Sequence, residues 1–248
     1  MELNLEDYLS EVSALLLAAG FVEDVYAEVE GYGLCGYKRI VKGEPLVYIS
    51  TGMHGDEPAG PLALLSALKS GLLDCVASLC ICPMLNPTGF VCGTRENRNG
   101  YDLNRDYMRQ LTVEVKGHTS YLEGLKPELF LSLHEDWEST GYYFYEINTE
   151  EDNPTMYESI VSAVTEVMPL EPNDLIDDHE VREKGWIYHR AEADEYECWP
   201  EAIFIAKKND CPLSFTFESP SSLAMEQRVK AHQVVLCSVI KERYGCSN

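Results

Sequence analysis

The stretch that decides the fold is Leu46-Val47-Tyr48-Ile49-Ser50, which leads into the loop His54-Gly55-Asp56-Glu57. The first five residues are mostly apolar, as expected for a central strand that is buried on both faces of a sheet. Pro58 then suits the first turn of a helix, which Leu62 to Leu68 continue. A buried strand, a polar loop and a helix in this order predict an α/β unit with the loop at the carboxyl end of the strand.

Segments with strand-like and helical patterns alternate along the rest of the chain. Residues 5–19 have the apolar spacing of an amphipathic helix, which Gly20 ends. The other predicted strands are 25–30, 34–41, 79–85, 129–133, 142–147 and 213–217, and the other predicted helices are 111–124, 154–168 and 222–243. Residues 86–89 predict a turn, and residues 170–200 predict acidic, irregular surface loops. We therefore expect a single α/β domain over residues 1–248, with a mixed, mainly parallel β-sheet flanked by helices on both faces.

The charge of the chain limits the classes of partner. The formal net charge is -23 at pH 7, from 42 Asp and Glu against 19 Lys and Arg. This argues against nucleic-acid binding, because phosphate contacts need clustered Lys and Arg, and against docking on anionic lipid. Solubility is the simplest explanation for the acidic surface, and an anionic substrate can still bind where Arg residues are concentrated in a cleft.

The cysteines and the N-terminus bear on the compartment. Nine Cys are scattered without a repeated spacing, at positions 35, 75, 80, 82, 92, 198, 211, 237 and 246. Several lie in apolar runs, which favours buried free thiols in a reducing compartment. Met1 to Asp7 lack the basic region of a signal peptide, and the apolar stretch from Val12 to Val22 is too short to cross a bilayer. These features predict a cytoplasmic protein that binds no membrane, and they leave its oligomeric state open.

Polar groups come where three of the predicted strands end: His54 with Glu57, His134, and Glu218. Because ligands of such folds gather at the carboxyl ends of the strands, we expect these side chains to form one site. Two His and one Glu leave the fourth position of a tetrahedral zinc ion open for water, which is the arrangement of a catalytic site. Glu218 follows a strand that should be buried, and its carboxylate suits the removal of a proton from that water.

Each of these motifs also has an ordinary explanation when it is read alone. His-x-x-Glu pairs occur by chance, a His at a strand end is commonly a core or surface residue, and Glu218 before Pro220 could cap a turn. Pro58 stands where the inverted His-x-x-Glu-His zinc motif needs a His, so the first motif is not of that class. The other histidines lie in polar or helical contexts and are interpreted as surface residues: His118, His179, His189 and His232.

The segment from Gly93 to Tyr107 contains three Arg and, read alone, is a solvated polar loop or a grip for a substrate carboxylate. With His54-x-x-Glu57 before it and His134 and Glu218 after it, the chain resembles the carboxypeptidase A-like family of zinc metallocarboxypeptidases over roughly residues 45–220. Two features resemble the bacterial murein-peptide amidase branch: the short chain and the sequence motif Arg-Glu-Asn-Arg-Asn-Gly-Tyr-Asp-Leu-Asn-Arg. The related aspartoacylase and succinylglutamate desuccinylase branch has the same basic arrangement of these motifs.

This resemblance implies a phosphorylase/hydrolase-like fold and one zinc ion per chain. His54, Glu57 and His134 would bind the zinc; carboxypeptidase A is itself a known His2Glu zinc enzyme, so the ligand set matches an established pattern. Glu218 would be the general base that activates the zinc-bound water, and then the acid that protonates the leaving amine. The donor set alone does not distinguish zinc from other divalent ions.

The resemblance also implies how the substrate would be held. Arg95 would polarise the scissile carbonyl and stabilise the oxyanion. Asn104 and Arg105 would bind the free carboxylate of the substrate, Arg105 through two parallel hydrogen bonds. The family uses a mobile Tyr upstream of its catalytic Glu, and Tyr196 is the first candidate for it, with Tyr188 the second.

The residues after His134 leave several interpretations open. Glu135 and Asp136 either orient His134 as hydrogen-bond acceptors or select a substrate with an amino group. The acidic segment from Asp174 to Glu197 is a candidate lid over the cleft. The nearby aromatic residues either line a pocket or cover a sheet face: Trp137, Tyr142, Tyr143 and Tyr145.

Taken together, the sequence predicts an enzyme that hydrolyses a peptide or amide bond beside a free carboxylate, as a metallocarboxypeptidase or peptide amidase acting on small peptides. The first alternative is a deacylase of N-acyl amino acids, although the sequence from Ser214 to Pro220 is closer to that of the peptidases. A non-catalytic binding module is the rival from another class. The intact Glu218 argues against that rival, because a mere binder needs no proton shuttle.

Overall fold

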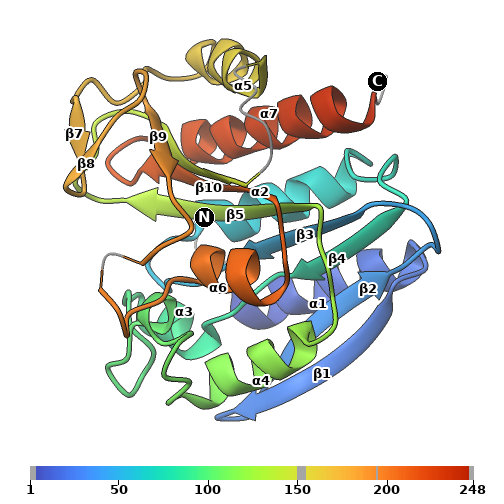
Figure 1. Cartoon of the computed structure of the whole chain (residues 1–248). Helices are drawn as coiled ribbons and strands as arrows, with labels where there is room; N and C mark the ends of the chain where they lie inside the picture. Colours follow the sequence, from blue (N-terminus) through green and yellow to red (C-terminus); the bar gives the residue numbers. More distant parts are fainter. Residues whose placement is uncertain (1–3, 150–154, 194, 246–248) are drawn as a thin grey trace.

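An eight-stranded mixed β-sheet crosses the molecule, and helices cover both of its faces (Figure 1). The computed structural model describes residues 4–149, 155–193 and 195–245. The sheet contains β1 (Val22–Val29), β2 (Tyr32–Arg39), β4 (Ser78–Cys82), β3 (Leu46–Thr51), β5 (Leu129–Asp136), β10 (Leu213–Pro220), β6 (Tyr143–Asn148) and β9 (Trp186–His189), in that order. The helices are α1 (Leu5–Ala18), α2 (Ala59–Lys69), α3 (Pro87–Cys92), α4 (Val113–Leu122), α5 (Thr155–Thr165), α6 (Glu201–Lys208) and α7 (Met225–Tyr244).

The centre of the sheet is parallel and its flanks are mixed. The neighbours β4, β3, β5 and β10 run parallel to one another, whereas β1, β2 and β6 pair antiparallel with β2, β4 and β10 respectively. The predicted α/β fold with a mixed, mainly parallel sheet is thereby confirmed. In the register of β5 and β10, Glu218 lies opposite His134, so two of the predicted site residues stand side by side.

Alternation along the central strands separates a core-facing side from a site-facing side. On one face, odd-numbered apolar residues join the main hydrophobic core with α1, α2, α5 and α7: Val47, Ile49, Leu131, Leu133, Phe215 and Phe217. Burying each such side chain stabilises the fold by about 1.5–3 kcal/mol. On the other face of β3, β5 and β10, even positions carry polar residues: Ser50, Ser132, His134, Ser214, Thr216 and Glu218.

Most predicted elements are present, but three expectations need correction. Residues 86–89 were expected to form a turn, yet Pro87 begins α3 after Asn86, whose side chain accepts the Gly89 N–H at 2.9 Å. The acidic segment 170–200 is more ordered than predicted: β9 joins the edge of the main sheet beside β6, and β7 (Leu175–Ile176) pairs with β8 (His179–Glu180). The strands β5 and β10 extend through His134 and Glu218 instead of ending before them.

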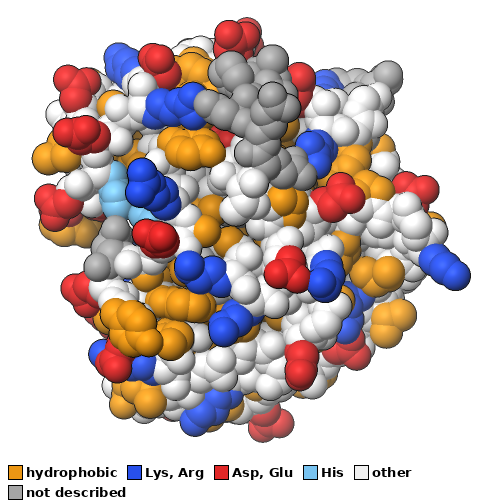
Figure 2. Space-filling model, in the orientation of Figure 1, with side chains coloured by type: hydrophobic (Ala, Val, Ile, Leu, Met, Phe, Trp, Pro, Cys, Tyr) orange, Lys and Arg blue, Asp and Glu red, His pale blue; other side chains and the backbone are white. Residues whose placement is uncertain are grey.

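The cysteines and histidines also differ in part from expectation. The free thiols include the buried Cys80, Cys82 and Cys211, but Cys92 is exposed and Cys75 is disulfide-bonded. The interpretation of the other histidines as surface residues is wrong for two of them, since the side chains of His118 and His232 are buried. Among the described helices, none has the length and apolar character needed to span a bilayer. Figure 2 shows acidic, basic and apolar side chains interspersed over one face of the molecule.

Candidate active site

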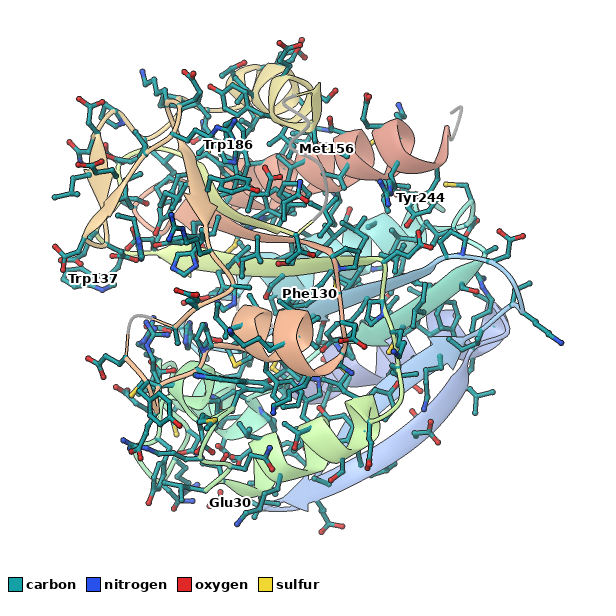
Figure 3. All side chains as sticks on the ribbon, in the orientation of Figure 1. Glu30, Phe130, Trp137, Met156, Trp186 and Tyr244 are labelled. Carbon is teal, nitrogen blue, oxygen red and sulfur yellow. The ribbon has the colours of Figure 1, made fainter. Side chains whose placement is uncertain are left out.

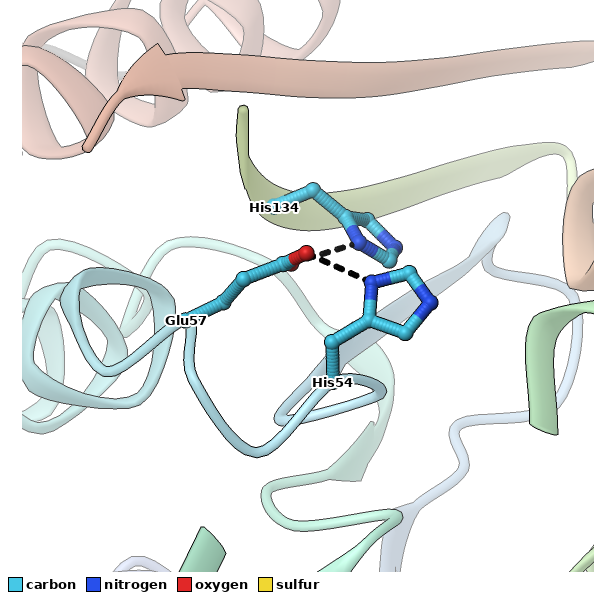
Figure 4. Close-up of side chains that lie close together, drawn as sticks. All are labelled: His54, Glu57 and His134. Atoms are coloured by element: carbon cyan, nitrogen blue, oxygen red, sulfur yellow. Dashed lines mark hydrogen bonds and ion pairs between the residues drawn. The ribbon is translucent and has the colours of Figure 1, made fainter. Parts of the chain in front are cut away.

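The three predicted metal ligands converge at the carboxyl ends of β3 and β5 (Figure 4). The Glu57 carboxylate lies between the two imidazoles, with Oε1 2.5 Å from His54 Nδ1 and Oε2 2.9 Å from His134 Nδ1. One potential ligand atom from each residue lies within 4.8 Å of the other two, and all three side chains are buried. Two imidazole nitrogens and one carboxylate oxygen that converge in a buried position suit a divalent ion such as zinc. The structure therefore supports a metal site at these residues.

Close backbone packing holds the loop that carries His54 and Glu57. Gly55 lies so near α3 that a Cβ there would be 1.9 Å from the carbonyl carbon of Gly89. The Gly55 N–H also donates to the Thr94 carbonyl at 2.9 Å. Any larger residue at position 55 would displace the loop, which explains why a glycine stands between His54 and the acidic residues.

The charges of this cluster favour a cation between its members. Burial disfavours a charged imidazole, but Glu57 and Asp102 outweigh that effect and raise the pKa of His54 to about 9. Burial also opposes ionisation of Glu57, yet the two imidazoles lower the pKa of its carboxyl well below the usual value. Burial lowers the pKa of His134. The cluster thus holds a proton on His54 in the absence of an ion, and a bound metal ion would replace that proton.

Asp102 connects the metal cluster to Arg95, a role that sequence reasoning missed. One carboxylate oxygen of Asp102 lies 3.2 Å from His54 Nε2, and the other accepts a hydrogen bond from Arg95 Nε at 3.0 Å. Burial alone would raise the pKa of Asp102, but His54 and Arg95 lower it far below the usual range. The ionised carboxylate therefore fixes the ring orientation of His54, which presents Nδ1 to the site.

Replacing Asp102 with Asn should weaken zinc binding by about 10–100-fold, because the side chain that orients His54 would lose its charge. The measurement is a competition titration of the metal-free protein with zinc and a chromophoric chelator. Glu96→Gln is the matched control, since Glu96 is an exposed acid in the same segment. Equal affinities for all three proteins would show that Asp102 does not position a metal ligand.

Glu218 lies where a proton acceptor for a metal-bound water would be needed. It lines the same cavity as His54, Glu57 and His134, and it pairs in register with His134. Burial, followed by the charges of Glu57 and two further acids, raises the pKa of Glu218 well above its usual value. A carboxylate with a raised pKa can both accept a proton and return it near neutral pH.

A cavity of about 650 Å³ extends from this cluster, and Arg95, Asn104 and Arg105 line it. The side-chain oxygen of Asn104 accepts the Glu201 N–H at 2.9 Å, and Arg105 Nη1 donates to the Asn104 carbonyl at 3.0 Å. The three residues are thus brought to the same cavity as the metal cluster. Their roles toward a substrate stay predictions.

The structure does not bring either candidate Tyr to the cavity. The side chain of Tyr196 is 78% exposed and is not among the described residues that line the cavity. The hydroxyl of Tyr188 donates to the Asn148 carbonyl at 2.9 Å, away from the metal cluster. A role for Tyr196 would require movement of its loop, which also supplies Glu195 and Cys198 to the cavity wall.

The remaining wall comes from the residues after His134 and from the acidic segment. Asp177, His179 and His189 of the candidate lid line the cavity, as do Tyr143 and Tyr145, whereas Tyr142 is buried and contacts His232. Figure 3 shows Trp137 projecting at the edge of the molecule, and this side chain also lines the cavity while being 75% exposed.

Of the two interpretations of Glu135 and Asp136, orientation of His134 is not seen among the contacts of the described residues, and selection of a substrate amino group stays a prediction. Glu135 accepts the Ala59 N–H at the start of α2 and forms an ion pair with Arg228. Asp136 accepts hydrogen bonds from the Glu138 N–H and from the Tyr143 hydroxyl. Both carboxylates thus serve to order the loops around the site.

A second buried carboxylate, Glu201, was not recognised from the sequence. It is the first residue of α6, is only 2% exposed, and lines the cavity. Its two oxygens accept hydrogen bonds from the Tyr48 and Ser50 hydroxyls, each at 2.8 Å. Burial raises the pKa of Glu201 to about 7.

This raised pKa predicts a pH dependence of stability. Between an unfolded-state pKa of 4.5 and a folded-state pKa of about 7, the folded protein binds the extra proton, so stability falls as pH rises through this window. Glu201→Gln removes the titration. The free energy of unfolding of the variant minus that of wild type should therefore be larger at pH 8 than at pH 5 by about 2–3 kcal/mol. Urea unfolding of both metal-free proteins at the two pH values tests this, and a difference that does not change with pH would contradict it.

Comparison with known proteins supports the class of fold seen here. The family described as succinylglutamate desuccinylase/aspartoacylase catalytic domain matches residues 44–146. Murein peptide amidase A of Vibrio campbellii is 33% identical over 120 residues, which cover 38% of this chain and 48% of that protein. The matched region is thus about half the length of that relative.

Solved structures agree over nearly the whole chain. A protein described as a candidate metallopeptidase from Shewanella denitrificans has a TM-score of 0.83 at 22% identity, covering 98% of this chain and 92% of its own. A metallo-carboxypeptidase from Burkholderia cenocepacia has a TM-score of 0.71 at 16% identity, covering 96% of this chain and 68% of its own. The fold is therefore carboxypeptidase-like. Together with the family match, this confirms the resemblance to the carboxypeptidase A-like family and to its amidase and aspartoacylase-type branches.

Proposed function

We propose that this protein is a zinc-dependent hydrolase of a peptide or amide bond that lies beside a free carboxylate. The observation that carries this proposal is the convergence of His54, Glu57 and His134 with Glu218 at one end of a 650 Å³ cavity. One zinc ion per chain is the proposed cofactor. The coarser conclusion, a hydrolase of the metallopeptidase and amidase group, is supported by the family and fold comparisons.

In the proposed reaction, His54, Glu57 and His134 hold the ion. A zinc ion held there would lower the pKa of a nearby water and polarise a carbonyl. Glu218 accepts a proton from the attacking water, because its carboxylate lies beside His134 and has a raised pKa. The same carboxyl then returns the proton to the leaving amine nitrogen.

Arg95 would stabilise the negative charge that develops on the carbonyl oxygen. Its Nε donates to Asp102, and its Nη1 lies 3.8 Å from Glu57 Oε1, so the guanidinium sits at the edge of the metal cluster. Asn104 and Arg105 would bind the free carboxylate of the substrate. Arg105 lines the cavity, and its charge also helps to lower the pKa of Asp102, so a guanidinium group stands near the metal cluster where an anion could bind.

The second candidate function is removal of an acyl group from a small N-acyl amino acid. The match of residues 44–146 to the succinylglutamate desuccinylase/aspartoacylase domain favours it. The metal cluster, Arg95, Asn104 and Arg105 all lie in that matched range, and the same chemistry would cleave either bond. Similarity to the murein peptide amidase of Vibrio campbellii favours the peptidase.

A substrate panel on the zinc-loaded protein tests these proposals. Small peptides with a free carboxyl terminus would be compared with N-acetyl-aspartate and N-succinyl-glutamate, and release of the amine would be measured. Peptide hydrolysis that stops after chelation of the metal supports the first function. Hydrolysis of only the N-acyl amino acids supports the second, and no hydrolysis of any compound by zinc-loaded protein would contradict both.

A further inference from the structure

One residue beyond the proposed metal ligand His134, an acid lies on the core-facing side of β5. Leu131 and Leu133 on that side join the main hydrophobic core, and Glu135 occupies the next position of the alternation. Although Glu135 borders the cavity, its side chain is completely buried. A buried carboxylate needs partners, because its ionised form has lost the solvation that water provides.

The partners of the Glu135 carboxylate come from two helices, α2 and α7. Its Oε1 accepts the Ala59 N–H at 2.6 Å, and its Oε2 pairs with Nη1 of Arg228 on α7. Pro58, the residue before α2, supplies no side-chain hydrogen bond to the helix, so Glu135 satisfies the first N–H of α2 in its place. The dipole of α2 also favours a negative charge at this end of the helix.

The backbone of the same residue contacts a proposed metal ligand. The Glu135 N–H donates to Glu57 Oε2 at 3.1 Å. Ala59, whose N–H the Glu135 side chain binds, comes only two residues after Glu57. Glu135 therefore holds the segment that carries Glu57 at two points, while its own strand carries His134. These contacts fix the position of one ligand relative to another that lies far away in the sequence.

Arg228 extends this connection towards the proposed proton acceptor. The helix α7 follows β10 in the chain, and β10 carries Glu218. In the register of β5 and β10, Ser219 lies opposite Glu135, next to the pair formed by Glu218 and His134. The Arg228 side chain is only 12% exposed, so solvent screens its attraction to Glu135 less than it would at the surface. The ion pair thus joins α7 to β5 and, through Glu135, to the start of α2.

We propose that the buried ion pair of Glu135 and Arg228 positions the metal site: it fixes the Glu57 carboxylate relative to His134 and thereby raises the affinity for the ion. Both are positioning residues, because the described cluster of converging ligand atoms includes neither of them. Ligands that are already held in place lose less conformational freedom when the ion binds. The inference rests on the metal site of the proposed function, but it does not depend on which substrate the protein cleaves.

Positioning can be separated from a direct effect of charge on the ion. A nearby negative charge attracts a cation and a positive charge repels it, so charge alone predicts that Glu135→Gln weakens zinc binding and that Arg228→Gln strengthens it. Positioning predicts that both substitutions weaken zinc binding, because either one breaks the ion pair. Glu135→Asp adds a second distinction. It keeps the charge but shortens the reach to Ala59 and Arg228, so only positioning predicts weaker binding.

The measurement is a competition titration of the metal-free full chain with zinc and a chromophoric chelator. We expect Glu135→Gln and Arg228→Gln each to weaken zinc binding by about 10–100-fold. Arg228→Lys keeps a cation beside Glu135 and should stay within about threefold of wild type. The matched controls are Glu138→Gln and Lys230→Gln, since each removes an exposed charge close in sequence to one member of the pair, and both should bind zinc as wild type does.

Two further measurements check the folding of the variants and the geometry of the site. Thermal melting of the metal-free proteins shows whether each variant is folded, and if Arg228→Gln is not, Glu135→Asp carries the same distinction. The visible absorption of cobalt bound in place of zinc depends on the arrangement of the ligands. This spectrum should shift in Glu135→Gln and stay unchanged in Lys230→Gln.

The possible outcomes distinguish this inference from the proposed function. Tighter zinc binding in Arg228→Gln, or unchanged affinity in folded Glu135→Gln and Glu135→Asp, would overturn the positioning role and leave the proposed function intact. A wild-type protein that binds no zinc would overturn the proposed function together with this inference.

Discussion

Replacing Glu218 with Gln is expected to lower kcat by about two to four orders of magnitude while the protein keeps its metal. Gln has nearly the shape of Glu but cannot accept a proton from water. The carboxyl of Glu218 is not among the converging ligand atoms of His54, Glu57 and His134, so metal binding should not depend on it. Steady-state kinetics on a cleaved substrate, together with metal content by mass spectrometry, measures both quantities.

The matched control for this substitution is Glu138→Gln. Glu138 is an exposed acid at the same cavity and lies outside the metal cluster, so kcat should change by less than about threefold. A Glu218→Gln protein that keeps more than a tenth of wild-type kcat would show that another group moves the proton. Loss of metal together with activity would instead mean that Glu218 contributes to ion binding.

Replacing His134 with Ala should remove the bound metal ion and with it the activity. Wild type is expected to carry about one zinc per chain, because two imidazoles and one carboxylate complete a three-ligand site. With one imidazole missing, only His54 and Glu57 remain, and kcat should fall by about a thousandfold or more. Metal content of the two purified proteins after incubation with zinc and desalting is the measurement.

His189→Ala provides the control for loss of an imidazole from the cavity. His189 lines the cavity but does not belong to the cluster that could hold an ion, so this variant should keep its zinc. If wild type takes up no zinc, the hydrolase proposal fails and a non-catalytic binding module becomes the better explanation. Metal retained by His134→Ala would mean that the ligand set is different.

The sequence was sufficient for the central fold because β3 and the first part of β5 are mostly apolar, and because β10 begins with regular alternation of apolar and small polar residues. It misplaced the ends of two of them. His134 and Glu218 are polar, and polar residues ordinarily mark the end of a buried strand. Here both residues stay within the strands because that face of the sheet borders the cavity, where polar side chains are accommodated. The short strand β9 was missed because its four residues lie within an acidic segment.

The metal ligands could be predicted because His54 and Glu57 are close in sequence and His134 follows a clear strand. The partners of Asp102 and Glu201 could not, since their hydrogen bonds join residues far apart in the chain. Asp102 contacts His54, which is 48 positions away, and Glu201 contacts Tyr48, which is 153 positions away. The burial of His118 could not be predicted either, because its hydrogen-bond partners Tyr48 and Tyr107 lie elsewhere in the chain.

Because side chains alternate along β5 and β10, substitutions that alter the cavity and substitutions that alter the core fall at neighbouring positions. Leu131, Leu133, Phe215 and Phe217 face the main core, whereas Ser132, Ser214 and Thr216 face the cavity. A substitution at one of the cavity-facing positions can reshape what the protein accepts without touching the side chains that hold the sheet to α2 and α7. New specificities are therefore open to this scaffold at little cost in folding, through changes confined to every second residue of two strands.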